Sequence, residues 1–144
     1  MTDRDWIEIT ADSLESAAAV AFVSDGAAGG IAVFAGTTRA ERSSEGRDLV
    51  ALDYEAYEEM ALKQMRELAQ AARQRWPVVK LAILHRVGRV EITRPSVVIA
   101  VSTPHRSDAF ACCRFLIDEL KKSVAIWKKE VWSDGSASWV HPVL

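Results

Sequence analysis

The chain has 144 residues, with 18 lysines and arginines against 20 aspartates and glutamates, so its formal net charge is −2. This length is typical of one domain, and we expect a single domain over residues 1–144. The apolar fraction of 49% and the charged fraction of 26% are ordinary for globular proteins and exclude disordered, collagen-like and coiled-coil chains. A nearly neutral chain also lacks the positive field typical of nucleic-acid-binding proteins.

Two further absences bear on location and redox chemistry. No stretch approaches the ~20 uninterrupted apolar residues of a membrane-spanning helix, so we expect no insertion into a membrane. The segment Met1 to Trp6 is acidic where a secretory signal would be basic, which indicates a cytoplasmic protein. Cys112 and Cys113 are sequence neighbours, and they offer neither a disulfide framework nor a zinc site of Cys-x-x-Cys spacing.

The first third of the chain predicts a strand, a helix and a second strand. We expect a short strand over residues 6–9 and then a helix whose N-cap is Thr10 or Asp12. The apolar side of this helix comprises Leu14, Ala18, Ala21 and Phe22. The apolar run 31–35 predicts a buried strand, and the polar segment 40–48 predicts a surface loop.

The middle of the chain changes from strand to helical periodicity. Residues 49–54 alternate as a strand does, and residues 55–75 predict a helix. Apolar residues recur in that helix at steps of four, four, three and four, on one stripe formed by Tyr57, Ala61, Met65, Leu68 and Ala72. Pro77 disfavours helical backbone at Trp76, so the helix should end there.

Beyond the proline, two β-branched apolar runs predict strands over residues 78–84 and 96–102. A turn near Gly88 and a possible short strand containing Val90 and Ile92 lie between them. Hairpin connections of this kind are typical of antiparallel pairing.

The last third of the chain predicts one more helix and a final hairpin. The helix begins after Pro104 and directs toward the core Ala109, Phe110, Cys113, Leu116, Ile117 and Leu120. A strand over residues 125–132, a turn over 133–136 and a short strand at 139–140 follow. We therefore expect an α+β fold, with a mixed and largely antiparallel sheet packed against two main helices and an N-terminal helix.

Several common catalytic motifs are missing from the sequence. It contains no P-loop of the form Gly-x-x-x-x-Gly-Lys-Ser/Thr and no Gly-x-Ser-x-Gly elbow. His85, His105 and His141 form no metal-ligand spacing with nearby carboxylates, so we expect no bound metal.

Cationic side chains instead stand at the predicted ends of strands and helices, where rigid elements hold binding loops. They are Arg39, His105, Arg106, Lys121, Lys128 and Lys129. Such a group suits a small anionic molecule, whereas a solvated basic edge, with Lys121 and Lys122 offsetting the helix dipole, is the alternative that charge positions alone leave open. Residues 103–130 hold six lysines and arginines against four acidic residues, too few to track a nucleic-acid backbone.

Seven spaced motifs carry a family resemblance. In chain order they are Phe34-Ala35-Gly36-Thr37-Thr38-Arg39, Leu52-Asp53-Tyr54-Glu55-Ala56-Tyr57 with Met60-Ala61, Arg75-Trp76-Pro77, His85-Arg86-Val87-Gly88, Ser96-Val97-Val98-Ile99-Ala100-Val101-Ser102, His105-Arg106 with Ala109-Phe110, and Ile126-Trp127-Lys128-Lys129-Glu130. Over residues 29–140 this series resembles the large, catalytic subunit of molybdopterin synthase. Two departures are Ala125, where the family often has proline, and a tail ending in Val143 and Leu144 without a cation.

The resemblance implies an α/β hammerhead-like fold and a sulfurtransferase of molybdenum cofactor biosynthesis. In that family a small ubiquitin-like subunit inserts a C-terminal Gly-Gly thiocarboxylate and supplies the sulfur for the dithiolene. The acceptor is cyclic pyranopterin monophosphate, and the resemblance implies neither a metal nor another cofactor. A non-catalytic module that docks a Gly-Gly tail or a phosphate ligand is the alternative.

The resemblance also assigns roles to residues. It implies Lys121 and Lys128 as catalytic residues, and as substrate-binding residues Thr37, Thr38, Arg39, His105, Arg106, Lys129 and Glu130. In one continuous helix, Arg106 and Lys121 would lie roughly 22 Å apart, too far to contact one pterin. Either this helix is broken, or Arg106 reaches the pocket of a second copy across a two-fold axis. The second alternative agrees with the dimeric large subunit that the resemblance implies, so we predict sites shared between two copies, in a homodimer within a heterotetramer.

Overall fold

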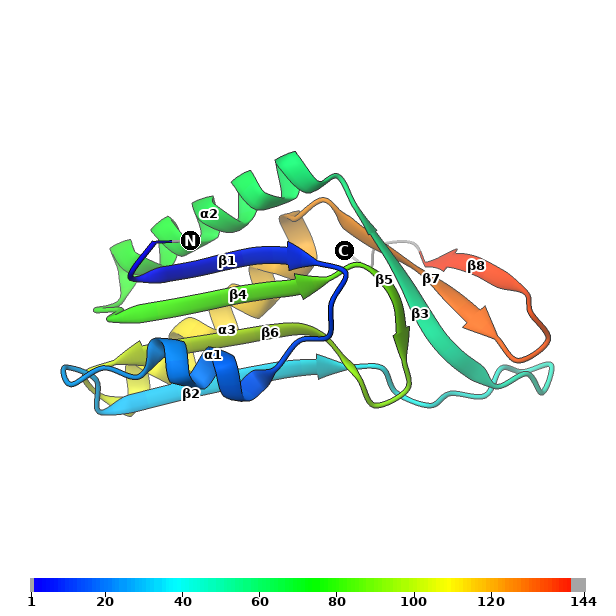
Figure 1. Ribbon diagram of the computed structural model, residues 1–144, viewed down its shortest axis with the longest axis horizontal. Coiled ribbons are helices and arrows are strands. Elements are labelled where there is room, and N and C mark those ends of the chain that lie inside the picture. The colour runs from blue at the N-terminus through cyan, green and yellow to red at the C-terminus, as the bar shows by residue number, and fades with distance from the viewer. Residues whose placement is uncertain (1, 141–144) are drawn as a thin grey trace.

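Two four-stranded sheets organise the chain in the computed structural model, which describes residues 2–140 (Figure 1). The first sheet has the order β1 (Asp5–Thr10), β4 (Lys80–Arg86), β6 (Pro95–Thr103) and β2 (Gly30–Thr37). The second has the order β5 (Gly88–Glu91), β3 (Leu49–Ala56), β7 (Ile126–Trp132) and β8 (Ala137–Val140). Among the pairs of these strands only β1 and β4 run parallel, so the expected α+β class with largely antiparallel pairing is confirmed.

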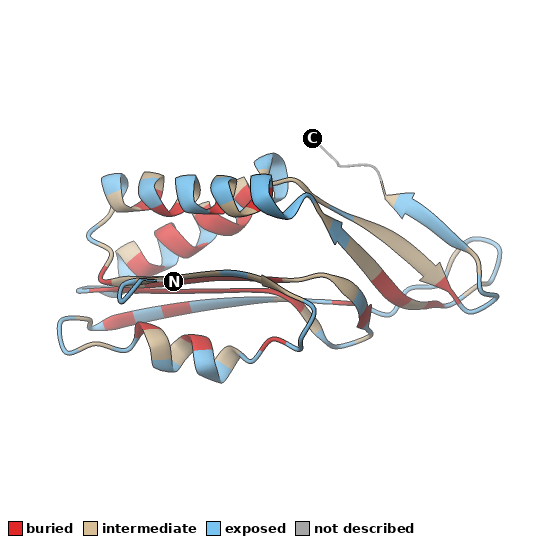
Figure 2. Ribbon diagram, turned by 45° about the horizontal axis from the view of Figure 1, so that its top comes forward, coloured by how far each residue is buried: buried red, intermediate tan, exposed pale blue. Residues whose placement is uncertain are grey.

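Three helices cover the two faces of the first sheet unequally. The long helices α2 (Glu58–Arg75) and α3 (Arg106–Ser123) lie on one face, and the short helix α1 (Ser16–Val23) lies on the other (Figure 2). None of the helices within residues 2–140 has both the length and the apolar composition needed to cross a membrane.

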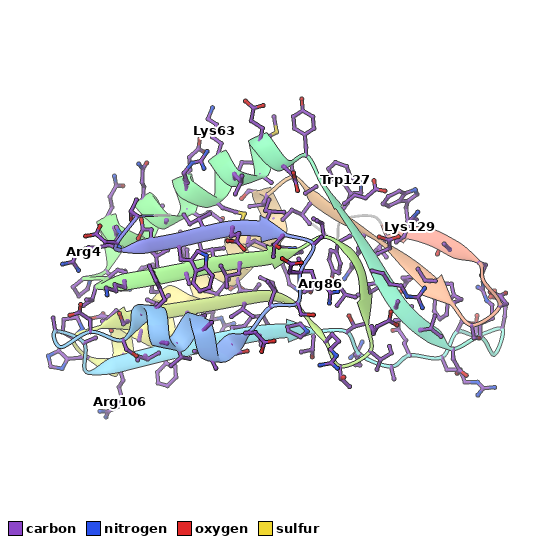
Figure 3. The ribbon with its side chains drawn as sticks, viewed as in Figure 1. Arg4, Lys63, Arg86, Arg106, Trp127 and Lys129 are labelled. Atoms are coloured by element: carbon purple, nitrogen blue, oxygen red, sulfur yellow. The ribbon has the colours of Figure 1, made fainter. Side chains whose placement is uncertain are left out.

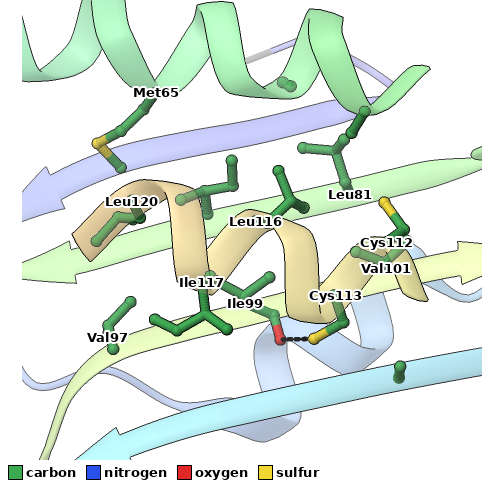
Figure 4. Packing of buried hydrophobic residues seen from close by; sticks show 14 of the residues in the cluster. Met65, Leu81, Val97, Ile99, Val101, Cys112, Cys113, Leu116, Ile117 and Leu120 are labelled. Atoms are coloured by element: carbon green, nitrogen blue, oxygen red, sulfur yellow. Dashed lines mark hydrogen bonds between the residues drawn. The ribbon is translucent and has the colours of Figure 1, made fainter. Parts of the chain in front are cut away.

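The central strands contribute side chains to the hydrophobic cores on both faces of the first sheet, because successive side chains of a strand point to opposite faces. In β6, Val97, Ile99 and Val101 join the core beneath α2 and α3, whereas Val98 and Ala100 pack toward α1. The larger core gathers Met65, Leu116 and the β6 side chains around α3 (Figure 4). Burial on both faces explains why residues 97–101 form an uninterrupted apolar run rather than an alternating one.

Strand β2 departs from the expectation of a buried strand. It is the edge of the first sheet, and Ile31, Val33 and Phe34 are 41%, 40% and 37% exposed. Only Gly30 and Ala32 of this strand are buried. The strand's composition correctly indicates β structure, but its outer edge has no partner among the described strands, so its apolar side chains remain half open to solvent.

Helix α1 begins later than the sequence suggests. Glu15 occupies its N-cap without a side-chain hydrogen bond, so the expected caps Thr10 and Asp12 are wrong. Leu14 is buried but precedes the helix, and the inward residues are Ala19 and Val23, whereas Ala18 and Ala21 are exposed. Because each helical residue turns by about 100°, a displaced start redirects the whole apolar face.

The two long helices need smaller corrections. Helix α2 starts at Glu58, which leaves Tyr57 before the helix and 63% exposed, although the end at Trp76 is as expected. In α3, Phe110 is 67% exposed and Cys112 points inward in its place. His141 and the C-terminal Val143 and Leu144 lie outside the described residues.

Candidate active site

A cavity of about 320 Å³ opens where both sheets meet the last turns of α3. Apolar side chains form much of its wall, among them Leu52, Val97, Ile117, Leu120 and Ile126. Its polar groups come from six separate elements and comprise Thr37, Tyr54, His85, Ser96, Lys121 and Lys128. Three of the residues predicted for the site, Thr37, Lys121 and Lys128, therefore line one opening.

The pairing of β3 with β7 directs Lys128 into this cavity. Tyr54 stands opposite Lys128 and Leu52 stands opposite Glu130, so these four side chains share one face of the second sheet. Lys129 lies on the other face, where its ammonium is 5.0 Å from the centroid of the Trp139 ring. The structure thus separates Lys129 from its two neighbours by strand alternation.

Two ammonium groups face the cavity together. Lys121 projects from the last turn of α3 and is exposed, whereas Lys128 is half-buried on β7. Burial lowers the pKa of Lys128, the charge of Lys121 lowers it further, and the carboxylates of Glu130 and Glu41 oppose that shift. A bound anion would relieve the repulsion between the two lysines, because an opposite charge favours the ammonium form.

The three residues predicted for the site at the end of β2 and directly after it lie in different surroundings. Thr37 lines the cavity, but Thr38 is buried beside it and donates a long 3.5 Å hydrogen bond to the carbonyl of Val90. The Arg39 side chain is 86% exposed and forms an ion pair with Glu41 at 3.7 Å. Since Glu41 also acts on Lys128, Arg39 belongs to the surroundings of the opening rather than to its wall.

His105 and Arg106 are not brought to this cavity within one chain. Helix α3 is continuous from Arg106 to Ser123, which places Arg106 and Lys121 roughly 22 Å apart along its axis. Figure 3 shows Arg106 at the opposite end of the molecule from Trp127 and Lys129. His105 is the exposed N-cap of the helix, and its carbonyl accepts a 2.5 Å hydrogen bond from the hydroxyl of Thr103.

His85 is a cavity residue that is not among the predicted site residues, although it begins one of the seven motifs. It is 4% exposed, and its ring meets the Tyr54 ring edge-on with centroids 5.1 Å apart. Its Nδ1 lies 2.8 Å from the carbonyl oxygen of Arg86. Burial lowers the pKa of His85 to about 4, with smaller contributions from the charges of Lys121 and Lys128. The available signal was a histidine at the end of the buried run 81–84, next to a turn.

Metal and thiol chemistry find no support at the cavity. Within residues 2–140, no three histidines, cysteines or acidic residues gather as metal ligands would. Both cysteines are buried in α3 rather than in the cavity wall. Burial raises the pKa of Cys112 to about 12 and that of Cys113 to about 11, so neither thiol is readily ionised.

Comparison with known proteins identifies the same family throughout. The family model described as MoaE protein matches residues 9–123. A molybdopterin synthase catalytic subunit 1 of Aedes aegypti is 46% identical over 131 residues, covering 90% of this chain and 83% of the relative. A catalytic subunit from Nostoc sp. is 45% identical over 121 residues, covering 83% and 72%.

A solved structure agrees with the sequence comparisons. The crystal structure of molybdopterin synthase from Staphylococcus aureus superposes with a TM-score of 0.86 at 32% identity, over 98% of both chains. The relatives are named as catalytic subunits, which describes them as parts of a larger assembly. With the paired lysines in their cavity, these matches establish that the chain belongs to the MoaE family, the catalytic subunits of the sulfurtransferase molybdopterin synthase.

Proposed function

We propose that the chain transfers sulfur from the C-terminal thiocarboxylate of a small ubiquitin-like subunit to cyclic pyranopterin monophosphate, in the cytoplasm. Two such deliveries form the dithiolene of molybdopterin. The observation that carries the proposal is the pairing of Lys121 with the half-buried Lys128 at one cavity. A sulfur-transfer site needs this combination of an anion-holding charge and a group able to exchange a proton.

The chemistry divides into attack and release. The thiocarboxylate sulfur forms a bond to a carbon of the substrate, and a carbon–oxygen bond at the same carbon breaks, with its oxygen leaving protonated as water or as the released end of the cyclic phosphate. The small subunit is then linked to the substrate as a thioester. Water then adds to the acyl carbon, and the resulting tetrahedral oxyanion collapses to a carboxylate while the sulfur remains on the pterin. The ammonium groups of Lys121 and Lys128 stabilise that oxyanion, and the lowered pKa of Lys128 suits it to carry the proton.

A Gly-Gly tail suits the shape of the opening. Glycines carry no side chain and can approach a surface closely, so an extended tail can enter between the strands and the end of α3. The Lys121 and Lys128 charges then lie where the tail's thiocarboxylate arrives, and the apolar side chains of the wall pack against the tail and the pterin. Thr37, Arg39 and Glu130 complete the surroundings that would receive the phosphate and the pterin.

A second copy of the chain supplies Arg106 in this proposal. Strand β2 has no partner on its outer edge among the strands of residues 2–140 and exposes Val33 and Phe34 at its centre, so two copies can pair antiparallel across it. In a register centred on these two residues, Gly30 of one copy stands opposite Thr37 of the other. Because Arg106 packs directly on Gly30, this pairing carries Arg106 to the partner's cavity. Two small subunits on such a homodimer give a heterotetramer with two sites.

Reconstitution tests the reaction itself. Purified chain is mixed with thiocarboxylated small subunit and cyclic pyranopterin monophosphate, and dithiolene product is measured. Lys121→Met and Lys128→Met should each reduce the rate by roughly 100-fold or more, as loss of an oxyanion-stabilising group does. Lys122→Met is the matched control, because the Lys122 ammonium pairs with Glu119 at 3.7 Å and does not line the cavity. Equal rates in all three variants would contradict the proposal.

Mixed dimers test the shared cavity. Arg106→Ala and Lys121→Ala chains, each inactive alone, are combined with different affinity tags and purified as heterodimers. One of the two cavities then has both residues intact, so up to half of the wild-type activity should return. Verified heterodimers without activity would show that Arg106 and Lys121 act in the same chain or in separate steps.

A further inference from the structure

The polarity of the cavity changes with depth. Its cationic groups, Lys121 and Lys128, are exposed and half-buried, whereas His85 is almost fully buried against Tyr54. A ligand held by the two lysines at its anionic end therefore extends toward His85. The imidazole is the most buried nitrogen-bearing side chain among the residues that line this opening.

The hydrogen bonding of His85 determines what it can offer a ligand. A carbonyl oxygen can only accept, so the 2.8 Å contact with Arg86 requires that Nδ1 carries a proton and donates. In the neutral ring this leaves Nε2 with a free lone pair. Among the residues that the structure describes, none donates a hydrogen bond to Nε2, and none of their unpartnered side-chain nitrogens is sealed from solvent. Within this part of the chain Nε2 is thus an acceptor without a partner, on a side chain that lines the cavity.

Burial keeps the imidazole neutral by lowering its pKa, and the neighbouring positive charges act in the same direction to a smaller extent. Lys121 from α3 and Lys128 from β7 both disfavour a third positive charge, and the ring lies edge-on to uncharged Tyr54 of β3. A neutral acceptor beside two cations matches a ligand that carries an anionic group at one end and an N–H donor at the other.

We propose that His85 is a substrate-binding residue whose Nε2 accepts a hydrogen bond from an N–H group of the bound reactants. The inference rests on the proposed function for the identity of those reactants. Two sources supply the donor: a peptide N–H of the Gly-Gly tail or a ring N–H of the pterin. Both present the same chemistry to Nε2, and the experiment separates them.

Two substitutions of His85 distinguish a role for the Nε2 acceptor from a role for the hydrogen bond between Nδ1 and the Arg86 carbonyl. His85→Asn places an amide nitrogen near the position of Nδ1, so it keeps the donor to Arg86 and removes the acceptor at Nε2. His85→Gln places an amide oxygen near the position of Nε2 and lacks the donor at Nδ1. A purely structural role predicts that asparagine is the better replacement, whereas the proposed role predicts glutamine.

The two ligand sources are measured in separate arms. One arm measures the Kd of the small subunit with its unmodified Gly-Gly carboxylate, and the other measures the KM of cyclic pyranopterin monophosphate. In His85→Asn, loss of one neutral hydrogen bond should raise either the Kd or the KM by about three- to tenfold, depending on which ligand supplies the donor. His85→Gln should stay within about twofold of wild type in that arm. Wild-type binding by His85→Asn in both arms, or equal losses in the two variants, would overturn the inference.

A measurement on the unmodified protein covers the case in which the variants do not fold. The nitrogen-15 resonance of His85 Nε2 is followed while either ligand is added to the wild-type chain. Hydrogen-bond acceptance should move this resonance in the arm that supplies the donor. If the protein is saturated with each ligand and the Nε2 resonance does not shift in either case, the inference is overturned. Product formation by the wild type separately tests the proposed function.

Discussion

Gly30 and Arg106 are in backbone contact, because a Cβ atom placed on Gly30 would lie 2.8 Å from the Cα and 2.9 Å from the nitrogen of Arg106. The edge strand β2 and the first turn of α3 therefore meet without an intervening side chain. This contact ties the position of Arg106 to the strand through which we propose that two copies pair.

Gly30→Ala should destabilise the chain and displace the start of α3. The added methyl group meets backbone atoms that cannot rotate away, and overpacking of this kind typically costs about 1–3 kcal/mol. Urea denaturation measures the loss. Gly26→Ala is the control, since a Cβ atom added at Gly26 would meet no other atom within 4 Å. Equal stabilities of the two variants would show that the contact is loose.

His85 should make stability depend on pH in a defined window. Its pKa is about 4 in the folded chain and about 6.5 when unfolded, so between these values only the unfolded chain binds the proton. The free energy of unfolding should therefore fall by about 3 kcal/mol as the pH drops from 6.5 to 4, with no contribution from this group above 6.5.

Urea midpoints at pH 7, 5.5 and 4.5 check this expectation. His85→Gln removes the titrating group and should flatten the decline, whereas His105→Gln removes an exposed imidazole and serves as the control. The same decline in His85→Gln and wild type would assign the acid sensitivity to other groups.

Lys121 and Glu130 should move the pKa of Lys128 in opposite directions. Lys121→Met removes a repelling charge and should raise the pKa of Lys128, whereas Glu130→Gln removes an attracting charge and should lower it further. The rate at which an amine reagent labels Lys128, followed by mass spectrometry across pH, reports the change. If neither substitution changes the pH dependence of labelling, the charges of Lys121 and Glu130 do not influence the pKa of Lys128.

The edge strand should control assembly. Val33→Asp places a charge at the centre of the proposed pairing, and an unpaired buried charge should weaken dimerisation by on the order of 100-fold. Analytical ultracentrifugation measures the effect. Met60→Asp changes a residue of similar exposure, 48%, on α2 away from this edge and should leave assembly unchanged. A dimer unaffected by Val33→Asp would place the interface elsewhere.

The sequence predicts elements better than the surroundings of individual side chains. The runs 78–84 and 96–102 indicate strands because burial on both faces removes polar residues from them. The same apolar character in residues 31–35 suggested burial, but a strand's position at the edge of a sheet is set by pairing with distant segments. Periodicity likewise cannot say where α1 starts when no side chain caps it.

The same reasoning explains the outcome at the site. Thr37, Lys121 and Lys128 were predicted and line one cavity, because each stands at the end or turn of an element near the junction of the sheets. Lys129 follows Lys128 in sequence, yet strand alternation sends it to the other face. His85 belongs to one of the seven motifs but was not predicted for the site, because its place there depends on a cavity formed by both sheets.

Neither cysteine should be needed for sulfur transfer. Cys112 and Cys113 are buried in α3, with pKa values of about 12 and about 11, so neither supplies a thiolate near neutral pH. Replacing both with alanine removes core atoms and should cost about 1–2 kcal/mol at each position. The rate of dithiolene formation per folded molecule should stay within about twofold of wild type. A large rate loss at full folding, checked by circular dichroism, would instead indicate a sulfur relay through the helix.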